Sequence, residues 1–363
     1  MSQVHHRSRL RVLHVIPAVA ARYGGPSRAI LETCRALEGQ DIESLIATTD
    51  ADGPVRLPVA LGRPITYQGV PTIFFARQWS EGFKYSHPLA CWLQTNVRRF
   101  DLVHIDAVFS HASLAAARAC QRHRIPYVVR PLGSLAPWCV NQKRFRKRLL
   151  WHFGVKQMLC RAAAIHYTTA EERRRVERRS GLRCGIVVPL GIDEGVLNTP
   201  RTSERFRQQY AGLGQAPYVL VLSRLHPVKG LELFFDAFLD VGCQEAFRHW
   251  RLVVAGDGEG GYVRNLKCLV QERGGDGRVL FTGWLDEPEK VAALQGAALL
   301  ALPSHHENFG LSAAEALACG VPVLVSTQVN LADEIRRAGA GWVVNLRRLD
   351  IRRALEEALR HEA

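Results

Sequence analysis

Residues Leu302–Ser326 read LPSHHENFGLSAAEALACGVPVLVS, and this stretch decides the fold that we expect. Apolar runs bound it, Ala297–Leu302 before and Val321–Val325 after, and such short runs are typical of buried parallel strands. Between them, the Ala-rich segment Ser312–Cys319 predicts a helix that ends at Gly320, because Gly caps helices at their C-terminal end. The stretch therefore predicts a strand–loop–helix–strand unit.

Two carboxylates stand out in this unit. Glu307 lies in the polar loop, and Glu315 lies in the first turn of the predicted helix. Ligands of open α/β sheets bind at the carboxyl ends of the strands, where this loop falls, and a helix N-terminus favours an anion such as phosphate. Ser312 and Glu315 also fit a capping box, in which Glu315 only stabilises the helix. Both roles stay open for Glu315, whereas Glu307 has no such structural explanation.

The pattern P-S-x-x-E-x-F-G-L-x-x-x-E-A-x-A-x-G-x-P-V over 303–323 resembles the signature of the family-4 glycosyltransferases. That family consists of retaining enzymes of GT-B architecture, an α/β fold in which two Rossmann-like doubly wound domains face each other across a cleft. The resemblance implies that Glu307 contacts the transferred sugar and that Glu315 binds the ribose of the nucleotide. It also implies that the residues after Glu307 frame the sugar and phosphate: Asn308, Phe309, Gly310 and Leu311.

A second motif supports a nucleotide site in the same half of the chain. After the predicted strand Tyr218–Leu222, Arg224 and Lys229 stand five residues apart in a strand-to-helix loop, so both cations can face one diphosphate. The family carries such a pair in that role, where it stabilises the departing nucleoside diphosphate. Asp257 lies in the Gly turn after the next strand, at the nucleotide side, and is a further candidate substrate-binding residue. The resemblance implies that the backbone at Trp284, after the strand that follows, meets the base, and a core position explains Trp284 equally well.

The first half of the chain opens with a similar unit. The predicted strand Arg11–Pro17 leads into a turn with Gly24 and Gly25, and a helix is predicted over Ala29–Leu37. A Gly-Gly turn by itself is compatible with a tight turn that binds nothing. The family resemblance implies that Gly24 and Gly25 approach the sugar and the diphosphate.

One segment departs from the family. Arg130-Pro131-Leu132-Gly133 resembles a stretch in which the family has a His just before the Gly, and Leu132 occupies that position here. Gly133 is kept as a predicted substrate-binding residue. His111, after the predicted strand 101–105, is a candidate substitute for the missing imidazole, and a hydrogen-bonded structural role explains His111 equally well.

Asp50 and Asp52 form an Asp-x-Asp pair of the kind that holds the metal in GT-A glycosyltransferases. They precede Gly53-Pro54, which is ordinary turn chemistry, and no further ligands cluster nearby in the sequence. We therefore expect a turn here, no metal site and no cofactor, with the diphosphate charge met by Arg224 and Lys229.

Composition restricts the class of protein. A chain of 363 residues with 47% hydrophobic residues can build two domains. No apolar run approaches the roughly 20 residues of a membrane span, and the N-terminus lacks a signal-peptide pattern. The nine Cys are scattered without a C-x-x-C pair, which favours reduced thiols in a cytoplasmic protein.

The net charge of +14 is concentrated in the first half. Residues 1–200 hold 29 Lys and Arg against 14 Asp and Glu, whereas residues 201–363 hold 19 against 20. The densest run, Lys143–Phe153, interleaves cations with apolar residues, as a surface-lying amphipathic helix does, although a solvated helix face has the same pattern. The run predicts docking on an anionic membrane surface. Its cations are Lys143, Arg144, Arg146, Lys147 and Arg148, and its inserting residues are Leu149, Leu150, Trp151 and Phe153.

We expect an N-terminal acceptor-side domain over 1–195, a linker over 196–216 and a C-terminal nucleotide-sugar domain over 217–363. Relatives usually continue into a further helix that crosses back onto the first domain, so by resemblance this chain ends early. The expected activity is a metal-independent hexosyltransferase that uses a UDP- or GDP-linked sugar and retains its configuration.

The basic first half favours a lipid-linked glycan acceptor in surface or exopolysaccharide synthesis, at the inner face of the plasma membrane. No nucleic-acid motif accompanies the charge. Two alternatives remain open. One is a non-catalytic basic relative that binds membrane or nucleic acid, which Leu132 and the short C-terminus favour. The other is a metal-dependent GT-A transferase, which only Asp50 and Asp52 favour.

Overall fold

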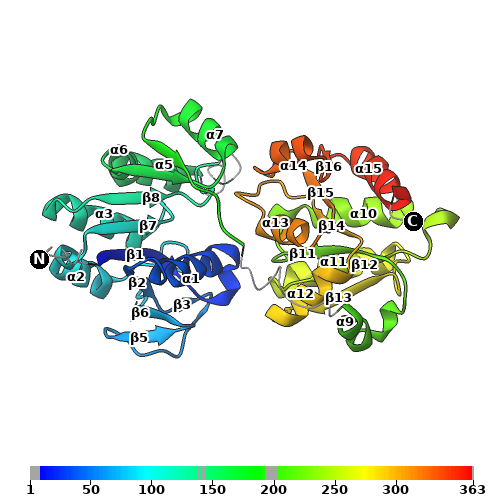
Figure 1. Ribbon diagram of the computed structural model, residues 1–363, viewed down its shortest axis with the longest axis horizontal. Coiled ribbons are helices and arrows are strands. Elements are labelled where there is room, and N and C mark those ends of the chain that lie inside the picture. Colours follow the sequence, from blue (N-terminus) through cyan, green and yellow to red (C-terminus); the bar gives the residue numbers. More distant parts are fainter. Residues whose placement is uncertain (1–8, 137–138, 140–143, 193–202, 362–363) are drawn as a thin grey trace, which may run out of the picture. The chain divides into compact units, whose positions relative to one another are not determined.

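The chain is described by a computed structural model that covers residues 9–136, 139, 144–192 and 203–361. It divides into two compact units, 1–191 and 192–363. Each unit is an α/β domain built on its own sheet, coloured blue to green for the first and green to red for the second (Figure 1). We describe each unit by itself.

The N-terminal unit has an eight-stranded sheet in the order β10-β9-β8-β7-β1-β2-β6-β5, parallel except at the β5–β6 pair. The chain builds outward from β1 through β2 to β6 and then continues from β7 on the other side of β1, so the strand order reverses between β1 and β7. The strands are β1 Leu10–Ala18, β2 Ile42–Thr49, β5 Pro64–Tyr67, β6 Val70–Phe75, β7 Leu102–Asp106, β8 Tyr127–Arg130, β9 Ala164–Tyr167 and β10 Gly185–Val187, with a separate hairpin of β3 Ala51–Asp52 and β4 Val55–Arg56. The helices are η1 Ala21–Tyr23, α1 Gly25–Glu38, α2 His87–Asn96, η2 Val97–Arg99, α3 His111–His123, α5 Arg144–Leu150, η3 Trp151–Val155, α6 Lys156–Cys160 and α7 Ala170–Ser180.

The C-terminal unit has a six-stranded, fully parallel sheet in the order β13-β12-β11-β14-β15-β16. This is the strand order of the doubly wound dinucleotide-binding fold, with its reversal between β11 and β14. The strands are β11 Tyr218–Leu222, β12 Arg251–Ala255, β13 Val279–Gly283, β14 Leu299–Leu302, β15 Val323–Ser326 and β16 Gly341–Val344. The helices are α9 Ser203–Gln209, η4 Ala211–Leu213, η5 Pro227–Lys229, α10 Leu231–Val241, η6 Glu245–Phe247, α11 Gly260–Glu272, α12 Glu287–Gly296, α13 Leu311–Ala318, α14 Ala332–Ala338 and α15 Arg348–His361.

The strand–loop–helix–strand unit predicted from 302–326 is confirmed. Every residue of β14 and of β15 is buried, as expected for parallel strands that are covered on both faces. The helix between them ends at Ala318, and Gly320 follows with φ 77°. The Val321 N–H then donates to the Ala316 carbonyl at 2.9 Å, which closes the C-terminal turn.

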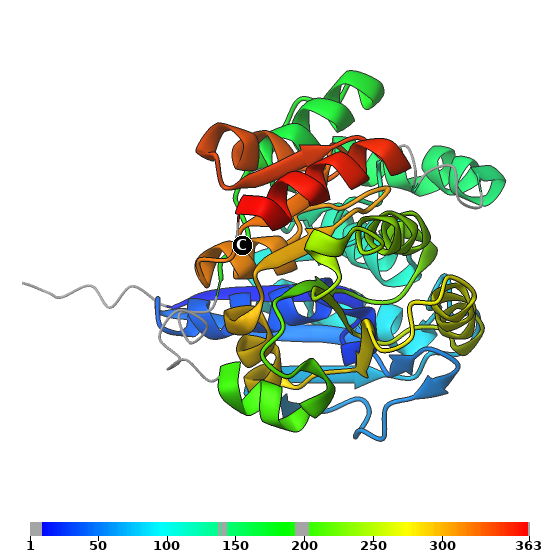
Figure 2. The same ribbon diagram turned by 90° about the vertical axis from the view of Figure 1, so that its right-hand side faces the viewer.

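Helices cover both faces of each sheet. In the N-terminal unit, α1 packs on one face, and α2, α3, α6 and α7 pack on the other. In the C-terminal unit, α10, α11 and α15 share one core, and α9, α12, α13 and α14 share another. Figure 2 shows α15, in red, beside the edge strand β16.

Some elements differ from the sequence expectations. The expected linker 196–216 contains helix α9, whose Phe206 is buried in the core of the C-terminal unit, and residues 193–202 lie outside the described part. The segment 55–100, to which we assigned no element, forms β4, β5, β6 and α2. Pro and Gly residues recur through this segment and break its apolar residues into short groups, so neither the strand period nor the helix period dominates the sequence pattern.

The basic run at 143–153 forms helix α5 and then the wider turn η3. Lys143 lies outside the described residues. Leu150 and Trp151 are half-buried and pack against the core, so less of each side chain is exposed than membrane insertion was expected to use. The exposed apolar side chains are instead Phe145, Leu149 and Phe153, at 82%, 52% and 75%. All nine Cys are free thiols, and within the described residues no helix combines the length and hydropathy needed to cross a membrane.

Candidate functional site

Lys229 and Glu307 meet where the strand order of the C-terminal sheet reverses. Strands β11 and β14 are neighbours at the centre of the sheet. Lys229 ends η5 after β11, and Glu307 lies in the loop after β14. Lys229 Nζ donates to Glu307 Oε2, and the two side chains keep 13% and 20% of their surface exposed. Doubly wound sheets bind ligands at such a reversal, so the fold brings two predicted catalytic residues together at its binding crevice.

The approach of the two loops depends on Gly230. Its φ of 64° lies in the left-handed region, and a Cβ at this position would be 2.4 Å from the carbonyl oxygen of Pro303. The loops are also tied by the His305 N–H, which donates to the Val228 carbonyl at 2.8 Å. Only Gly adopts this φ at little cost and leaves room for the carbonyl, so Gly230 permits the contact between Lys229 and Glu307.

The loop that carries Glu307 is held by the segment after β15. The Glu307 N–H donates to the Gln328 carbonyl at 3.3 Å, and the Asn330 N–H donates to the Glu307 carbonyl at 3.2 Å. Asn330 Nδ2 also donates to the Asn308 carbonyl at 3.0 Å. Sequence analysis missed Gln328 and Asn330, because they lie beyond the family signature and no local pattern marks them.

Glu315 is not a capping residue. Helix α13 has Gly310 as its N-cap, without a side-chain cap, and Glu315 is its fifth residue. The Glu315 carboxylate is 5% exposed and accepts a hydrogen bond from Lys290 Nζ at 2.9 Å, while Lys290 also contacts Glu287 at 2.7 Å. Lys290, on α12, was missed by sequence analysis. Its charge offsets the cost of burying Glu315. The residues that precede Glu315 lie half-buried or buried in the same unit: Asn308, Phe309, Gly310 and Leu311.

Three further predicted residues lie at the carboxyl ends of β11, β12 and β13. Arg224 is exposed and forms no ion pair with any residue that the structure describes. Its loop rests on the β12 turn: the Leu225 N–H donates to the Asp257 carbonyl at 2.8 Å, and a Cβ at Gly258 would be 2.0 Å from the Leu225 oxygen. Trp284 follows β13 and is 57% exposed.

In the N-terminal unit, Gly24 and Gly25 lie on one side of the strand reversal and His111 on the other. Gly24 has φ 71° and precedes α1, which begins at Gly25. The neighbouring Tyr23 hydroxyl donates to Glu81 at 2.5 Å and fixes this turn. All three predicted residues therefore lie at the ligand-facing edge of the sheet.

His111 is held by its surroundings. Its Nδ1 accepts a hydrogen bond from the Ser86 N–H at 3.3 Å, and its ring centroid is 4.3 Å from that of Tyr85. Burial, followed by the charges of Arg118 and His87, lowers the pKa of His111. A neutral imidazole that accepts at Nδ1 carries its proton on Nε2. This arrangement is compatible with a structural role and with a hydrogen bond that Nε2 donates to a substrate.

The Leu132–Gly133 turn is anchored by a buried carboxylate. Leu132 has φ 53°, a strained value for a bulky residue. The Gly133 N–H donates to Glu172 Oε1 at 3.1 Å, and Glu172 Oε2 accepts from the Thr168 N–H at 2.9 Å. Burial raises the pKa of Glu172. The pattern Thr169-x-x-Glu172 marks only a helix start, so the sequence gives no signal for this anchor.

Asp50 and Asp52 lie at the β3–β4 hairpin, where the sequence predicts a turn. Asp50 Oδ1 accepts from the Arg77 N–H at 2.7 Å, and Asp52 pairs with Arg22 at 2.8 Å. Strands β3 and β4 pair across Gly53. The expected turn is confirmed.

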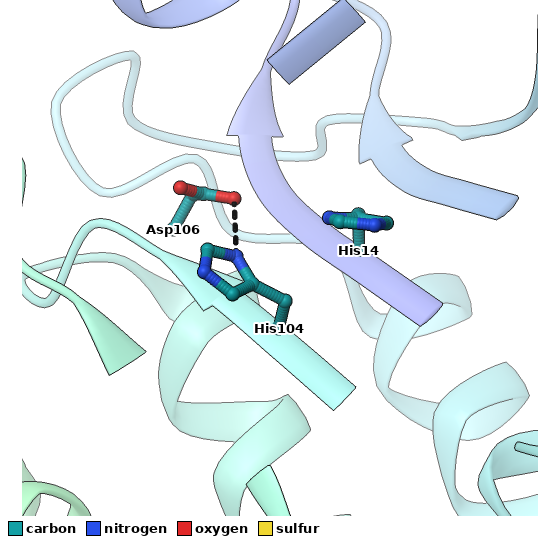
Figure 3. Close-up of side chains that lie close together, drawn as sticks. All are labelled: His14, His104 and Asp106. Carbon is teal, nitrogen blue, oxygen red and sulfur yellow. Dashed lines mark hydrogen bonds and ion pairs between the residues drawn. The ribbon is translucent and has the colours of Figure 1, made fainter. Parts of the chain in front are cut away.

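A buried polar cluster lies in the N-terminal sheet (Figure 3). His14 comes from β1, and His104 and Asp106 come from β7, with ligand atoms within 4.8 Å of one another. Asp106 Oδ1 accepts from Arg130 at 2.5 Å, and Asp106 Oδ2 lies 3.3 Å from His104 Nδ1. Burial alone would raise the pKa of Asp106, but Arg130 and His104 lower it below its usual range.

The spacing of this cluster would admit a metal ion, but its bonding does not favour one. Both oxygens of Asp106 are engaged, and His104 Nε2 lies 3.2 Å from His166 Nδ1. A metal ion would displace these hydrogen bonds and place further positive charge beside Arg130. We interpret His104, Asp106, Arg130 and His166 as a hydrogen-bonded network that joins β7, β8 and β9, with the His14 ring of β1 packed beside His104.

Comparisons with known proteins agree with this architecture. The family described as "Glycosyl transferase 4-like domain" matches residues 24–191, and the family described as "Glycosyl transferases group 1" matches residues 202–362. The D-inositol 3-phosphate glycosyltransferase of Jonesia denitrificans is 25% identical over 95% of this chain and 85% of its own length. The GDP-mannose-dependent alpha-(1-6)-phosphatidylinositol dimannoside mannosyltransferase of Mycobacterium tuberculosis is 33% identical over 45% of this chain and only 40% of its own length.

Solved structures show the same fold. The HepE protein of Anabaena, in complex with UDP and glucose, has a TM-score of 0.76 at 20% identity, over 96% of this chain and 90% of that chain. WaaG, a glycosyltransferase involved in lipopolysaccharide biosynthesis, has a TM-score of 0.73 at 16% identity, with the same shares covered. The expected fold class, with two Rossmann-like domains of the GT-B type, is confirmed.

We expect His14 to make the N-terminal unit sensitive to acid. Burial, together with His104, lowers the pKa of His14 from 6.5 to about 3. The unfolded chain therefore binds more protons between these values, and the free energy of unfolding falls as the pH drops below 6.5. From pH 7 to pH 5 this loss is about 2 kcal/mol.

In urea unfolding, the free energy of unfolding that is lost between pH 7 and pH 5 should therefore be about 2 kcal/mol smaller for His14→Leu than for the unaltered protein. The exposed His87 gives a matched control, because His87→Leu should leave the pH dependence unchanged. An equal loss in His14→Leu and the unaltered protein would contradict the assignment.

Proposed function

Since this chain belongs to the family-4 glycosyltransferases of GT-B architecture, we propose that it transfers a hexose from a UDP- or GDP-linked sugar to an acceptor hydroxyl, with retention of configuration. The observation that carries this proposal is the Lys229–Glu307 pair at the strand reversal of the C-terminal sheet. A nucleotide sugar offers this pair a diphosphate for the cation and sugar hydroxyls for the carboxylate.

In the proposed reaction, the bond between the sugar C1 and the phosphate oxygen breaks. A bond from C1 to the acceptor oxygen forms on the same face, and the acceptor proton passes to an oxygen of the departing phosphate. Arg224 and Lys229 stabilise the charge that grows on the diphosphate. Glu307 orients the sugar through charge-assisted hydrogen bonds, and Glu315 binds the ribose. No side chain acts as a nucleophile.

Lys229 has a double role in this proposal. Without donor it is paired with Glu307, and that pair holds both side chains in place before the donor arrives. When the donor binds, the diphosphate becomes the stronger partner of Lys229, since it carries more negative charge than one carboxylate. Glu307 is then available to the sugar hydroxyls.

The other predicted residues keep supporting roles in the proposal. Trp284 and Asp257 lie at the carboxyl ends of strands on the nucleotide side of the C-terminal sheet. In the N-terminal unit, Gly24, Gly25 and Gly133 would approach the sugar and acceptor through backbone groups. His111 would stand in for the imidazole that Leu132 lacks.

For the acceptor, we propose a lipid-linked, phosphorylated glycan at an anionic membrane surface on the cytoplasmic side. Helix α5 supports this choice, because it combines exposed Arg146 and Arg148 with exposed Phe145 and Leu149. The names of two relatives also contain a phosphorylated inositol.

The first test of the proposed function concerns Glu307. Glu307→Gln keeps the shape of the side chain, and the loop keeps its backbone bonds to Gln328 and Asn330. Transfer should fall by a factor of about 100 or more, because the charge that orients the sugar is lost. Nucleoside diphosphate should still bind in calorimetric titration. Near-normal turnover by the purified variant would refute the role of Glu307.

The second test of the proposed function concerns the two cations separately. Arg224→Ala and Lys229→Ala should each weaken nucleoside diphosphate binding by a factor of roughly ten to a hundred, the equivalent of about 1.5–3 kcal/mol for one charge-assisted hydrogen bond. Arg353→Ala is a matched control, because Arg353 is exposed on α15 and has no ion pair among the described residues. If both variants kept full affinity, the diphosphate site would have to lie elsewhere.

We also propose that transfer needs no metal ion, because Asp50 and Asp52 are committed to Arg77 and Arg22, which leaves Arg224 and Lys229 to neutralise the diphosphate. Activity measured after exhaustive EDTA treatment should equal that of the untreated protein. Loss of activity that Mg²⁺ or Mn²⁺ restores would refute this part of the proposal.

The membrane part of the proposal is tested with liposomes. Binding in co-sedimentation should require anionic lipid and weaken as salt rises, since each basic residue near an anionic leaflet contributes about 1 kcal/mol. A variant with Ser at Phe145, Leu149 and Phe153 should bind at least tenfold more weakly. Val55→Ser is the control, because Val55 is 55% exposed on the separate β3–β4 hairpin. Binding that ignores lipid charge, or equal binding by the Ser variant, would point to a soluble acceptor.

A further inference from the structure

A cavity of about 260 Å³ lies within the N-terminal unit, between helices α5 and α7. Its lining residues come from α7, from α5 with the turn η3, and from the loops after β7 and β8. The lining residues are Phe109, Leu135, Lys147, Arg148, Trp151, Val176, Arg179 and Ser180.

The position of the cavity follows from the topology of the sheet. Phe109 comes three residues after β7, and Leu135 comes five residues after β8. These are the carboxyl ends of two neighbouring parallel strands, where doubly wound sheets bind their ligands. Phe109 is also two residues from His111, and Leu135 is two residues from Gly133. Two residues that line the cavity therefore lie close in sequence to two predicted substrate-binding residues, His111 and Gly133.

The walls of the cavity are apolar, and its charges are all positive. Phe109, Leu135, Trp151 and Val176 supply the apolar surface, and no Asp or Glu is among the lining residues. Lys147 Nζ lies 5.3 Å from the centroid of the Phe109 ring, which places a cation against the apolar wall. Such a surface suits a ligand with an apolar body and an anionic head.

Two of these cations have no carboxylate partner in the described part of the chain. Arg148 and Arg179 form no ion pair with any residue that the structure describes. The contrast within α7 is clear, because its other arginines near the start of the helix are paired with carboxylates on the same helix: Arg173 with Glu177, and Arg174 and Arg175 with Glu171. Two positive charges without a carboxylate partner among the described residues therefore lie at the cavity.

The exposed apolar residues of α5 and η3 indicate a ligand that is anchored in a membrane. Phe145, Leu149 and Phe153 are spaced by four residues and are largely exposed, so they form an apolar stripe on the surface. The same helix and its following turn line the cavity with Lys147, Arg148 and Trp151. A molecule that is anchored in a membrane would find both surfaces on one element.

We propose that this cavity binds the phosphate-bearing lipid of the acceptor. The head-proximal part of one lipid chain lies between α5 and α7, and Lys147, Arg148 and Arg179 bind its phosphate or diphosphate. Pockets for small molecules usually measure about 300–1,000 Å³, so this cavity holds only part of the chain and the remainder stays in the bilayer. The inference rests on the proposed glycosyltransferase function, and it names the acceptor class for that function.

Binding is tested with farnesyl phosphate, below its micelle concentration, by calorimetric titration of the full chain. Farnesol and inorganic pyrophosphate are the matched probes for the apolar and anionic parts taken alone. Farnesyl phosphate should bind at least tenfold more tightly than either. Equal binding of farnesol would show an apolar cavity without a phosphate site, and equal binding of pyrophosphate would show an anion site without a lipid site. Either result overturns the proposal, as does a failure of farnesyl phosphate to bind.

Two variants locate the binding. Val176→Trp fills the cavity, and the double variant Arg148→Gln, Arg179→Gln removes the unpaired charge. Each should weaken farnesyl phosphate binding at least tenfold. Arg178→Gln is the control, because Arg178 is exposed beside Arg179 and does not line the cavity. If Val176→Trp fails to fold, the double variant alone decides, and unchanged binding in it refutes the proposal.

The outcome for the cavity can be separated from the outcome for the proposed function. Nucleoside diphosphate binding belongs to the C-terminal unit and should be unchanged in both cavity variants. If the chain transfers sugar to a lipid-linked acceptor and both variants do so with unchanged KM, the cavity proposal is wrong and the function stands. If farnesyl phosphate binds as described and no sugar is transferred, the function is wrong and the cavity stands.

Discussion

The contact between Lys229 and Glu307 requires two loops, 78 positions apart in the chain, to meet at one point of a sheet. Parallel strands β11 and β14 provide that point, because they are neighbours and both end at the same edge. Gly230 lets the first loop approach the second to within a distance that any side chain would prevent. Gln328 and Asn330 hold the second loop from the next strand. The predicted chemistry of this site therefore depends on backbone geometry as much as on the two charged groups.

Buried carboxylates in both units follow one physical rule. Burying a charge is costly unless it has a partner, and each carboxylate here has a partner from another element of its own unit. Glu315 is bound by Lys290, Asp106 by Arg130, and Glu172 by backbone N–H groups that include that of Gly133. The contacts of Glu315 and Glu172 fix a helix and a loop, and the contact of Asp106 joins the carboxyl ends of β7 and β8. Stability and the geometry of the ligand-facing edge therefore depend on the same contacts.

The two units divide the charge of the protein between them. The C-terminal unit is nearly neutral overall and places its cations one by one, with Lys229 paired and Arg224 exposed. The N-terminal unit carries the excess positive charge, and part of it remains without a carboxylate partner at Arg148 and Arg179. The diphosphate of a nucleotide is bound by a few cations at defined positions. Attraction to an anionic membrane depends instead on the summed charge of a protein surface. This difference in charge distribution matches the donor and acceptor roles that we propose for the two units.

The sequence by itself determined the strand–loop–helix–strand unit over 302–326, the strand β11 to the residue, and the family signature around Glu307 and Glu315. These features are local, since a run of apolar residues and a capping Gly act within a few residues. Only the tertiary structure decided which partners those residues have. It replaced the capping role of Glu315 with a bond to Lys290, turned Leu150 and Trp151 toward the core, and gave Gly133 its anchor in Glu172. Contacts between segments far apart in the chain arise from strand order and packing, and no local pattern in one sequence encodes them.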